Sequence, residues 1–78
     1  PIRTTADVLA LAEKECTVEY NQIKVYRDEA AGIWKVEYQI LYGYQGYQYV
    51  YLNDEGITLM VSGSGSKVEQ WQEAYPGP

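Results

Sequence analysis

The stretch 33–61, IWKVEYQILYGYQGYQYVYLNDEGITLMV, gives the strongest indication of the fold. It contains three runs rich in β-branched and aromatic residues, namely IWKVEYQILY, YQYVYL and ITLMV, and the two short segments between them each end in glycine. Such runs, with turn residues between them, are typical of strands joined by hairpins. The stretch therefore predicts a three-stranded antiparallel β-meander.

The first run of this meander alternates in polarity. Its apolar side consists of Trp34, Val36, Tyr38, Ile40 and Tyr42, and its polar side of Lys35, Glu37 and Gln39. An antiparallel sheet that is covered on one side only has one apolar and one wet face. We therefore expect the apolar set to face the core and the polar set to face water.

The second run carries apolar side chains on both of its faces. Tyr47, Tyr49 and Tyr51, which we call the tyrosine stripe, share one face, and Val50 and Leu52 share the other. A shift of one residue in strand pairing exchanges the two faces, so the length of the preceding loop decides which set joins the core.

Two loop lengths give opposite answers for the tyrosine stripe. A two- or four-residue loop places the stripe in the core. A three-residue loop at 44–46, with Gly46 in the left-handed conformation of a bulge, places Val50 and Leu52 there instead. We favour the three-residue loop because it buries aliphatic side chains and leaves the hydroxyl groups near water.

The second hairpin is predicted from Asn53–Gly56, whose residues suit a four-residue loop built on a type I turn and closed by a glycine with positive φ. In this register Ile57, Leu59 and Val61 point inward, and Thr58, Met60 and Ser62 point outward.

Upstream of the meander, TTADVLALAEKEC at positions 4–16 predicts a helix. Thr4 or Thr5 suits the N-cap, and Asp7 suits the positive end of the helix dipole. Its apolar residues gather on one side. Cys16 is interpreted as a small buried hydrophobe, and a half-exposed thiol at the last helical turn is the alternative. A further strand is expected over 17–27, with Ile23 and Val25 pointing inward.

These elements predict an α+β domain at 1–62, with one N-terminal helix packed on a four-stranded antiparallel β-meander. Residues 63–78 are interpreted as a Gly/Ser linker followed by a C-terminal tail. The predicted core consists of Val8, Leu11, Ala12, Ile23, Val25, Trp34, Val36, Ile40, Val50, Leu52, Ile57 and Leu59.

Composition argues against several classes of function. The net charge is −5 and the six Lys and Arg residues are scattered, which argues against nucleic acid as a partner. No apolar run reaches the roughly 20 residues of a membrane span, so membrane insertion is not expected. The chain has no His and one Cys, so the usual zinc ligands and Cys–His catalytic pairs are missing. Asp54 and Glu55 are interpreted as solvated turn residues. We expect no metal, no cofactor and no enzymatic activity.

The candidate binding site is the face that carries the tyrosine stripe. Tyrosine is enriched at recognition sites because it offers a large area and a polar tip at low entropic cost. The predicted partner face consists of Tyr47, Tyr49, Tyr51, Leu41 and Met60. Two alternatives remain. The tyrosines could simply stabilise a wet sheet face, or the tail could lay Trp71 and Tyr75 over them.

The order of motifs resembles that of PepSY-type domains. The residues that match are Ala6, Leu9 and Ala12 of the helix, Trp34, Val36 and Tyr38 of the W-K-V-E-Y strand, and Val50 to Gly56 of the hairpin V-Y-L-N-D-E-G. Asn53 stands where that family commonly has Asp. The resemblance implies a cystatin-like fold and a bacterial protein that is secreted or held in the cell envelope. It also implies a non-catalytic role, such as the restraint of a peptidase.

Three functions follow as expectations from this reading. The first is a non-catalytic module of PepSY type that binds a protein partner through its open sheet face. The second is carbohydrate binding by exposed Tyr and Trp side chains, whose rings stack on sugars. The third is a structural domain that forms a homodimer through its C-terminal tail.

Overall fold

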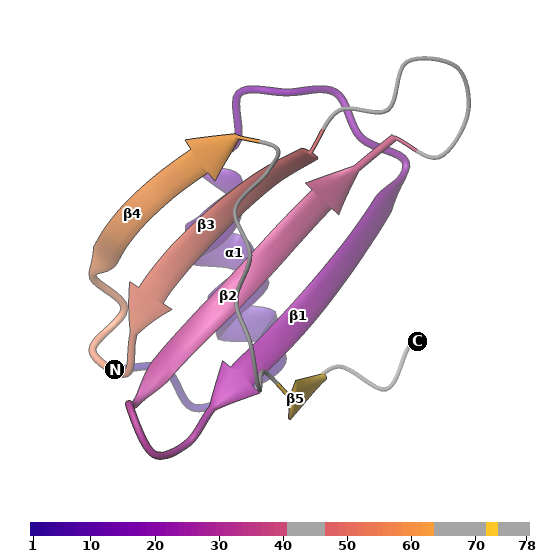
Figure 1. Ribbon diagram of the computed structural model, residues 1–78. Helices are drawn as coiled ribbons and strands as arrows, with labels where there is room; N and C mark the ends of the chain where they lie inside the picture. The colour runs from indigo at the N-terminus through magenta and orange to yellow at the C-terminus, as the bar shows by residue number, and fades with distance from the viewer. Residues whose placement is uncertain (41–46, 64–71, 74–78) are drawn as a thin grey trace.

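One helix lies against one face of an antiparallel sheet (Figure 1). The computed structural model describes residues 1–40, 47–63 and 72–73. Its elements are α1 (Thr5–Glu13), β1 (Gln22–Asp28), β2 (Ile33–Gln39), β3 (Tyr47–Asn53), β4 (Thr58–Gly63) and β5 (Gln72–Glu73). The strands lie in the order β4-β3-β2-β1-β5. The prediction of an α+β domain with a helix and a four-stranded antiparallel meander is thus confirmed at that level.

The pairing of β2 with β3 settles which face of each strand meets the helix. Val36 pairs with Val50, and Gln39 pairs with Tyr47. Seven residues, 40–46, lie between these last partners. An odd number of residues between two paired residues gives the same assignment of faces, whether that number is seven or three. Val50 and Leu52 therefore face the helix, as the three-residue loop predicts. The predicted loop itself, at 44–46, falls outside the described residues.

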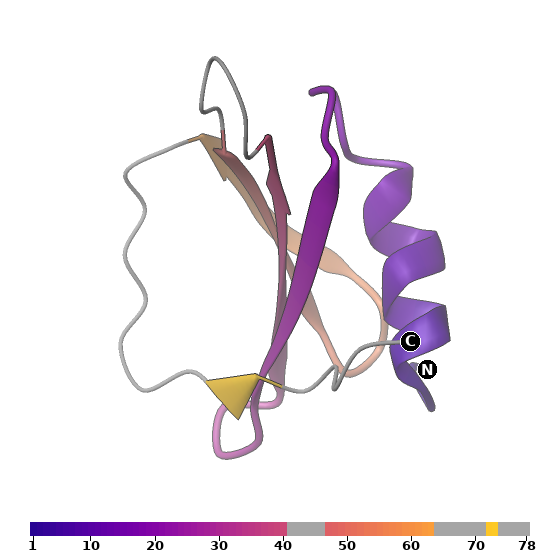
Figure 2. The same ribbon diagram turned by 90° about the vertical axis from the view of Figure 1, so that its right-hand side faces the viewer.

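The core lies between α1 and the middle of the sheet. α1 packs on β2 and β3, and Figure 2 shows it along one side of the sheet. The residues buried there are Val8, Ala12, Val25, Val36, Tyr38, Val50 and Leu52. Leu11, Ile23 and Trp34 pack against this cluster while only partly buried, and Ile40 is half-buried just beyond the end of β2. Most of the predicted core is therefore confirmed.

The helix begins where its sequence predicts. Thr4 is the N-cap and its Oγ1 accepts a hydrogen bond from the Asp7 backbone N–H. The Asp7 carboxylate in turn accepts from the backbone N–H groups of Arg3 and Thr4, at 2.9 and 3.0 Å. This capping box satisfies N–H groups that a helix end otherwise leaves unpaired, and these bonds lower the pKa of Asp7.

The segment between α1 and β1 is less regular than predicted. The helix ends at Glu13, not Cys16, and the first strand starts at Gln22, not Thr17. Thr17 lies outside any strand. Its backbone N–H donates to Gln48 Oε1 at 2.9 Å, and its Oγ1 accepts a hydrogen bond from Gln48 Nε2 at 3.0 Å. Cys16 is half-buried and packs against the core. Its environment thus lies between the two alternatives, a buried hydrophobe and a half-exposed thiol.

The inward placement of Ile57 and Leu59 was wrong. Ile57 is 59% exposed and Leu59 is 51% exposed. Two causes explain the difference. The Asn53 N–H bonds the Ile57 carbonyl, which shortens the loop by one residue, and the strand pairing shifts at Leu59, between Met60 and Thr58. In addition, α1 packs mainly on β2 and β3, and most side chains of the outer strand remain exposed.

The predicted tail contributes one short strand to the sheet. Gln72 and Glu73 of β5 pair with Arg27 and Tyr26 of β1. The four long strands are the predicted ones, and β5 extends the sheet beyond β1 at the edge opposite β4.

Candidate functional site

The tyrosine stripe lies on the sheet face opposite the helix. Residues that pair directly across two strands point to the same face. Tyr49 pairs with Glu37, and Tyr51 pairs with Lys35. On the far side of β2, Lys35 pairs with Tyr26 of β1. The side of the sheet predicted for the stripe is therefore confirmed, and it also holds charged residues of β2.

Lys35 is the centre of this face. Its Nζ lies 4.7 Å from the ring centroid of Tyr26 and 4.5 Å from that of Tyr49. The Tyr26 hydroxyl donates to Glu37 Oε1 at 3.1 Å. Ammonium groups are attracted to aromatic faces by the quadrupole of the ring. The side chains of β1, β2 and β3 thus form one connected polar and aromatic network.

This network is buried, which the sequence did not predict. Lys35 is 7% exposed and Glu37 is 8% exposed, whereas both were expected to face water. Burial lowers the pKa of the Lys35 ammonium, and the negative charge of Glu37 opposes that shift. Burial also raises the pKa values of the Tyr49 and Tyr51 phenols. Each shift has the sign expected when a charged form is withdrawn from water.

The predicted partner face is accordingly only partly accessible. Tyr49 and Tyr51 are 9% and 6% exposed, so the expectation that they stand open to a partner was wrong. Tyr47 is half-buried, and Met60 is 49% exposed. Leu41, and the alternative in which Trp71 and Tyr75 cover the stripe, fall outside the described residues.

The accessible apolar surface lies instead on β4 and the residue before it. Ile57, Leu59, Met60 and Val61 are 59%, 51%, 49% and 40% exposed. We call these four residues the β4 patch. Single exposed apolar residues are ordinary, whereas neighbouring ones on an edge strand form a candidate contact surface.

A simple geometric argument accounts for the patch. The nine residues of α1 make a helix about 14 Å long and about 10 Å wide. Strands in a sheet lie about 4.8 Å apart, so such a helix covers about two of them. The width of a single helix and the number of predicted strands together could therefore have shown that an outer strand stays largely uncovered.

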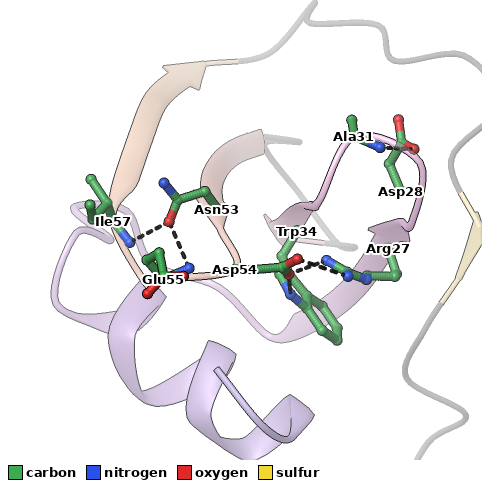
Figure 3. A network of polar contacts seen from close by, with 8 residues as sticks. All are labelled: Arg27, Asp28, Ala31, Trp34, Asn53, Asp54, Glu55 and Ile57. Carbon is green, nitrogen blue, oxygen red and sulfur yellow. Dashed lines mark hydrogen bonds and ion pairs between the residues drawn. The ribbon is translucent and has the colours of Figure 1, made fainter. Parts of the chain in front are cut away.

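A polar cluster at the turns of the two hairpins holds these hairpins together (Figure 3). Asp54 Oδ1 accepts from Arg27 Nη1 at 2.5 Å and from Trp34 Nε1 at 3.1 Å, while Oδ2 accepts from Arg27 Nη2 at 3.2 Å. The Arg27 guanidinium also lies 4.6 Å from the Trp34 ring centroid. These bonds, with Arg27 first among them, lower the pKa of Asp54.

Asn53 orders the turn beside this cluster. Its Oδ1 accepts from the backbone N–H groups of Glu55 and Ile57, at 2.9 and 3.0 Å, and Gly56 follows with a φ of 85°. Side-chain caps of this kind are how Asn stabilises turns. The cluster fixes the hairpins, and its Asp54 carboxylate is committed to Arg27 and Trp34.

Residues 1–40, 47–63 and 72–73 contain no group of three or more His, Cys, Asp or Glu side chains placed to hold a metal ion. The helix described there is too short and insufficiently apolar to cross a membrane.

Comparison of the chain with protein-family models, with curated proteins and with solved structures finds no match in any of the three.

Proposed function

We propose that this chain is a non-catalytic protein-interaction module of PepSY type, and that it contacts its partner through the β4 patch. The observation that carries the proposal is the exposure of 40–59% at four consecutive or nearly consecutive apolar side chains on an edge strand. Proteins commonly bind extended segments by adding a strand to such an edge, where main-chain hydrogen bonds supply affinity and side-chain contacts supply specificity.

The resemblance to PepSY domains supports the same class of function. On the basis of this resemblance, the proposal includes a cystatin-like fold, a location outside the cell or in the cell envelope, and the restraint of a peptidase. The burial of Tyr49 and Tyr51 moves the proposed contact from the tyrosine stripe to the neighbouring strand, and Met60 belongs to both surfaces. The same burial withdraws Tyr49 and Tyr51 from any aromatic platform for carbohydrate binding.

Selection of peptide ligands tests this function. Short random peptides, displayed on phage, are selected against the immobilised full chain. We expect binders with alternating apolar residues, because a strand added to β4 presents every second side chain to the patch. Binding should fall at least about 10-fold in the double variant Leu59→Lys/Val61→Lys, since charges are then placed in the contact.

The control is Val18→Lys, which replaces an apolar residue that is 37% exposed and lies outside the strands. It should leave peptide binding unchanged. Selection that yields no binders, or binders equally tight to the Leu59→Lys/Val61→Lys variant, would show that the β4 patch does not bind protein.

A further inference from the structure

The β4 strand has the properties of an edge that accepts another strand. Among the described strands it has a neighbour on one side only, β3. Its last four residues, Met60 to Gly63, pair regularly with Tyr51 to Gln48, so its outer side is regular over the same length. A strand edge presents alternating N–H and C=O groups that pair readily with a second chain.

The usual devices that prevent edge pairing are few on this strand. Natural edges are guarded by charged residues, by proline or by bulges. From Gly56 to Gly63 the sequence contains no charged residue and no proline. The shift of pairing at Leu59 interrupts only the start of the strand. Association through the remainder is therefore not opposed by any charge on the strand itself.

We propose that β4 pairs antiparallel with β4 of a second copy of this chain, around a two-fold axis. This inference rests on the proposed function and names the partner that the β4 patch takes. An antiparallel two-fold contact brings the same surface of both copies together, so each residue of the strand must tolerate its counterpart. An uncharged strand meets that condition, because no like charges face each other across the axis.

The faces of β4 limit the registers of this contact to those in which like faces meet, and we take the one centred on Val61. Val61 pairs with Val50 and so lies on the helix side, whereas Met60 pairs with Tyr51 and lies on the opposite side. Direct partners across strands must share a face. Val61 opposite Val61 of the second copy satisfies this, with Met60 opposite Ser62. Both α1 helices then lie on the same side of one continuous sheet and flank the central valines.

The size and the charge of each copy set the strength of the association. A stable interface buries about 800 Å² per partner, contributed by about 20–30 residues, and the β4 patch supplies only a few of these. A weak dimer is expected, forming between about 10 μM and 1 mM. Each copy carries a net charge of −5, so the copies repel at long range and added salt strengthens the dimer. A basic partner strand would show the opposite salt dependence.

Sedimentation velocity of the full chain over that concentration range, at low and at moderate salt, tests the inference. The wild type should shift toward dimer with concentration, and more so with salt. The Leu59→Lys/Val61→Lys variant should remain monomeric because it places like charges across the axis, and Val18→Lys should dimerise as the wild type does. Circular dichroism checks that each variant is folded.

A cross-link tests the register independently. In a Cys16→Ser background, Val61→Cys should form an intermolecular disulfide, because direct cross-strand partners bring their Cβ atoms within reach of each other. Val18→Cys should not form one. A wild type that stays monomeric without a Val61→Cys disulfide, or an association that salt weakens, would overturn the inference. Peptide selection then shows separately whether the β4 patch binds another protein.

Discussion

Asp54 joins three segments that are distant in sequence. Its carboxylate bonds Arg27 of β1 and Trp34 of β2, its backbone N–H bonds the Gly32 carbonyl at 3.1 Å, and its carbonyl accepts from the Ile2 N–H at 2.9 Å. A two-pronged contact between arginine and a carboxylate is the geometry in which exposed ion pairs contribute measurably. This residue therefore ties the N-terminus to both hairpin turns.

Replacing this carboxylate should give a pH-dependent loss of stability. The pKa of Asp54 is lowered from 3.8 in the folded chain, so the unfolded chain binds the proton more readily. The stabilisation is therefore present above about pH 4 and is lost as the pH falls through the folded pKa. Asp54→Asn should lower the urea midpoint at pH 7, and its difference from wild type should shrink below pH 4.

Glu55→Gln is the matched control, because it removes the neighbouring carboxylate while Asp54 keeps its two bonds to the Arg27 guanidinium. It should leave the urea midpoint close to that of the wild type at both pH values. A gap between Asp54→Asn and wild type that persists undiminished at pH 2.5 would contradict the role assigned to the charge.

Removing a polar group at Tyr38 should not lower the stability, in contrast to the substitution at Asp54. Its side chain is 1% exposed, its ring lies 4.9 Å from that of Tyr20, and its hydroxyl has no hydrogen-bond partner among the described residues. A buried polar group without a partner costs about 1–3 kcal/mol. Tyr38→Phe should therefore leave stability unchanged or raise it by about 1 kcal/mol at pH 7, as measured by urea denaturation.

The same variant should alter stability in alkali. Burial raises the pKa of Tyr38 above 10.0, so the folded chain holds this proton more tightly than the unfolded chain does. Stability from this group is complete below pH 10 and is lost as the pH rises through the folded pKa. Tyr38→Phe should lose less stability than wild type above pH 10. A variant destabilised by more than about 1 kcal/mol at pH 7 would show that the hydroxyl has a partner.

At the scale of elements, the turn between β3 and β4 depends on one glycine. Gly56 has a φ of 85°, and a Cβ built there would lie 2.9 Å from Leu11 Cδ1 on the helix. A residue with a side chain is disfavoured in that conformation by roughly 1–2 kcal/mol. Gly56→Ala should therefore destabilise the chain by about that amount, or somewhat more because Leu11 must move.

Gly63→Ala is the control for the glycine variant. A Cβ at Gly63 meets nothing within 4 Å and its φ is not in the left-handed region. Urea denaturation should show it within about 0.5 kcal/mol of wild type. Equal effects of the two substitutions would mean that neither the positive φ nor the contact with Leu11 matters.

The elements also show what alternation can predict and what it cannot. Alternation placed Val50 and Leu52 toward the helix, because the side of a strand depends only on the parity of its pairing. The parity of the pairing does not show how deeply a side chain is buried. Lys35 and Glu37 are on the polar side as expected, yet they are buried by their tertiary surroundings, which no local pattern records. Ile57 was misplaced because a shorter turn and a shift at Leu59 are changes of one residue, which alternation cannot detect.

At the scale of the whole molecule, the short helix decides which surfaces remain for contact. α1 packs mainly on β2 and β3, and β4 lies at the edge of the sheet (Figure 1). The apolar side chains of β4 are exposed. On the other face, the network around Lys35 is buried. Because the apolar side chains of β4 are more exposed than Tyr49 and Tyr51, β4 is the surface proposed for the contact.

Chemical nitration of the tyrosines measures how accessible the tyrosine stripe is in the folded chain. Tyr20 is 39% exposed, whereas Tyr38, Tyr49 and Tyr51 are 1–9% exposed. Nitration acts on the accessible phenolate, and burial both shields these three rings and raises their pKa values, so the two effects act in the same direction. With tetranitromethane at pH 8, peptide mass spectrometry should find Tyr20 modified at least about 10-fold faster than these three.

This comparison is made on the folded chain, and the difference should vanish in urea, where all four rings are solvated. Nitration of Tyr49 and Tyr51 as fast as that of Tyr20 in the folded chain would show that the stripe is open, and the contact would then return from β4 to the tyrosines.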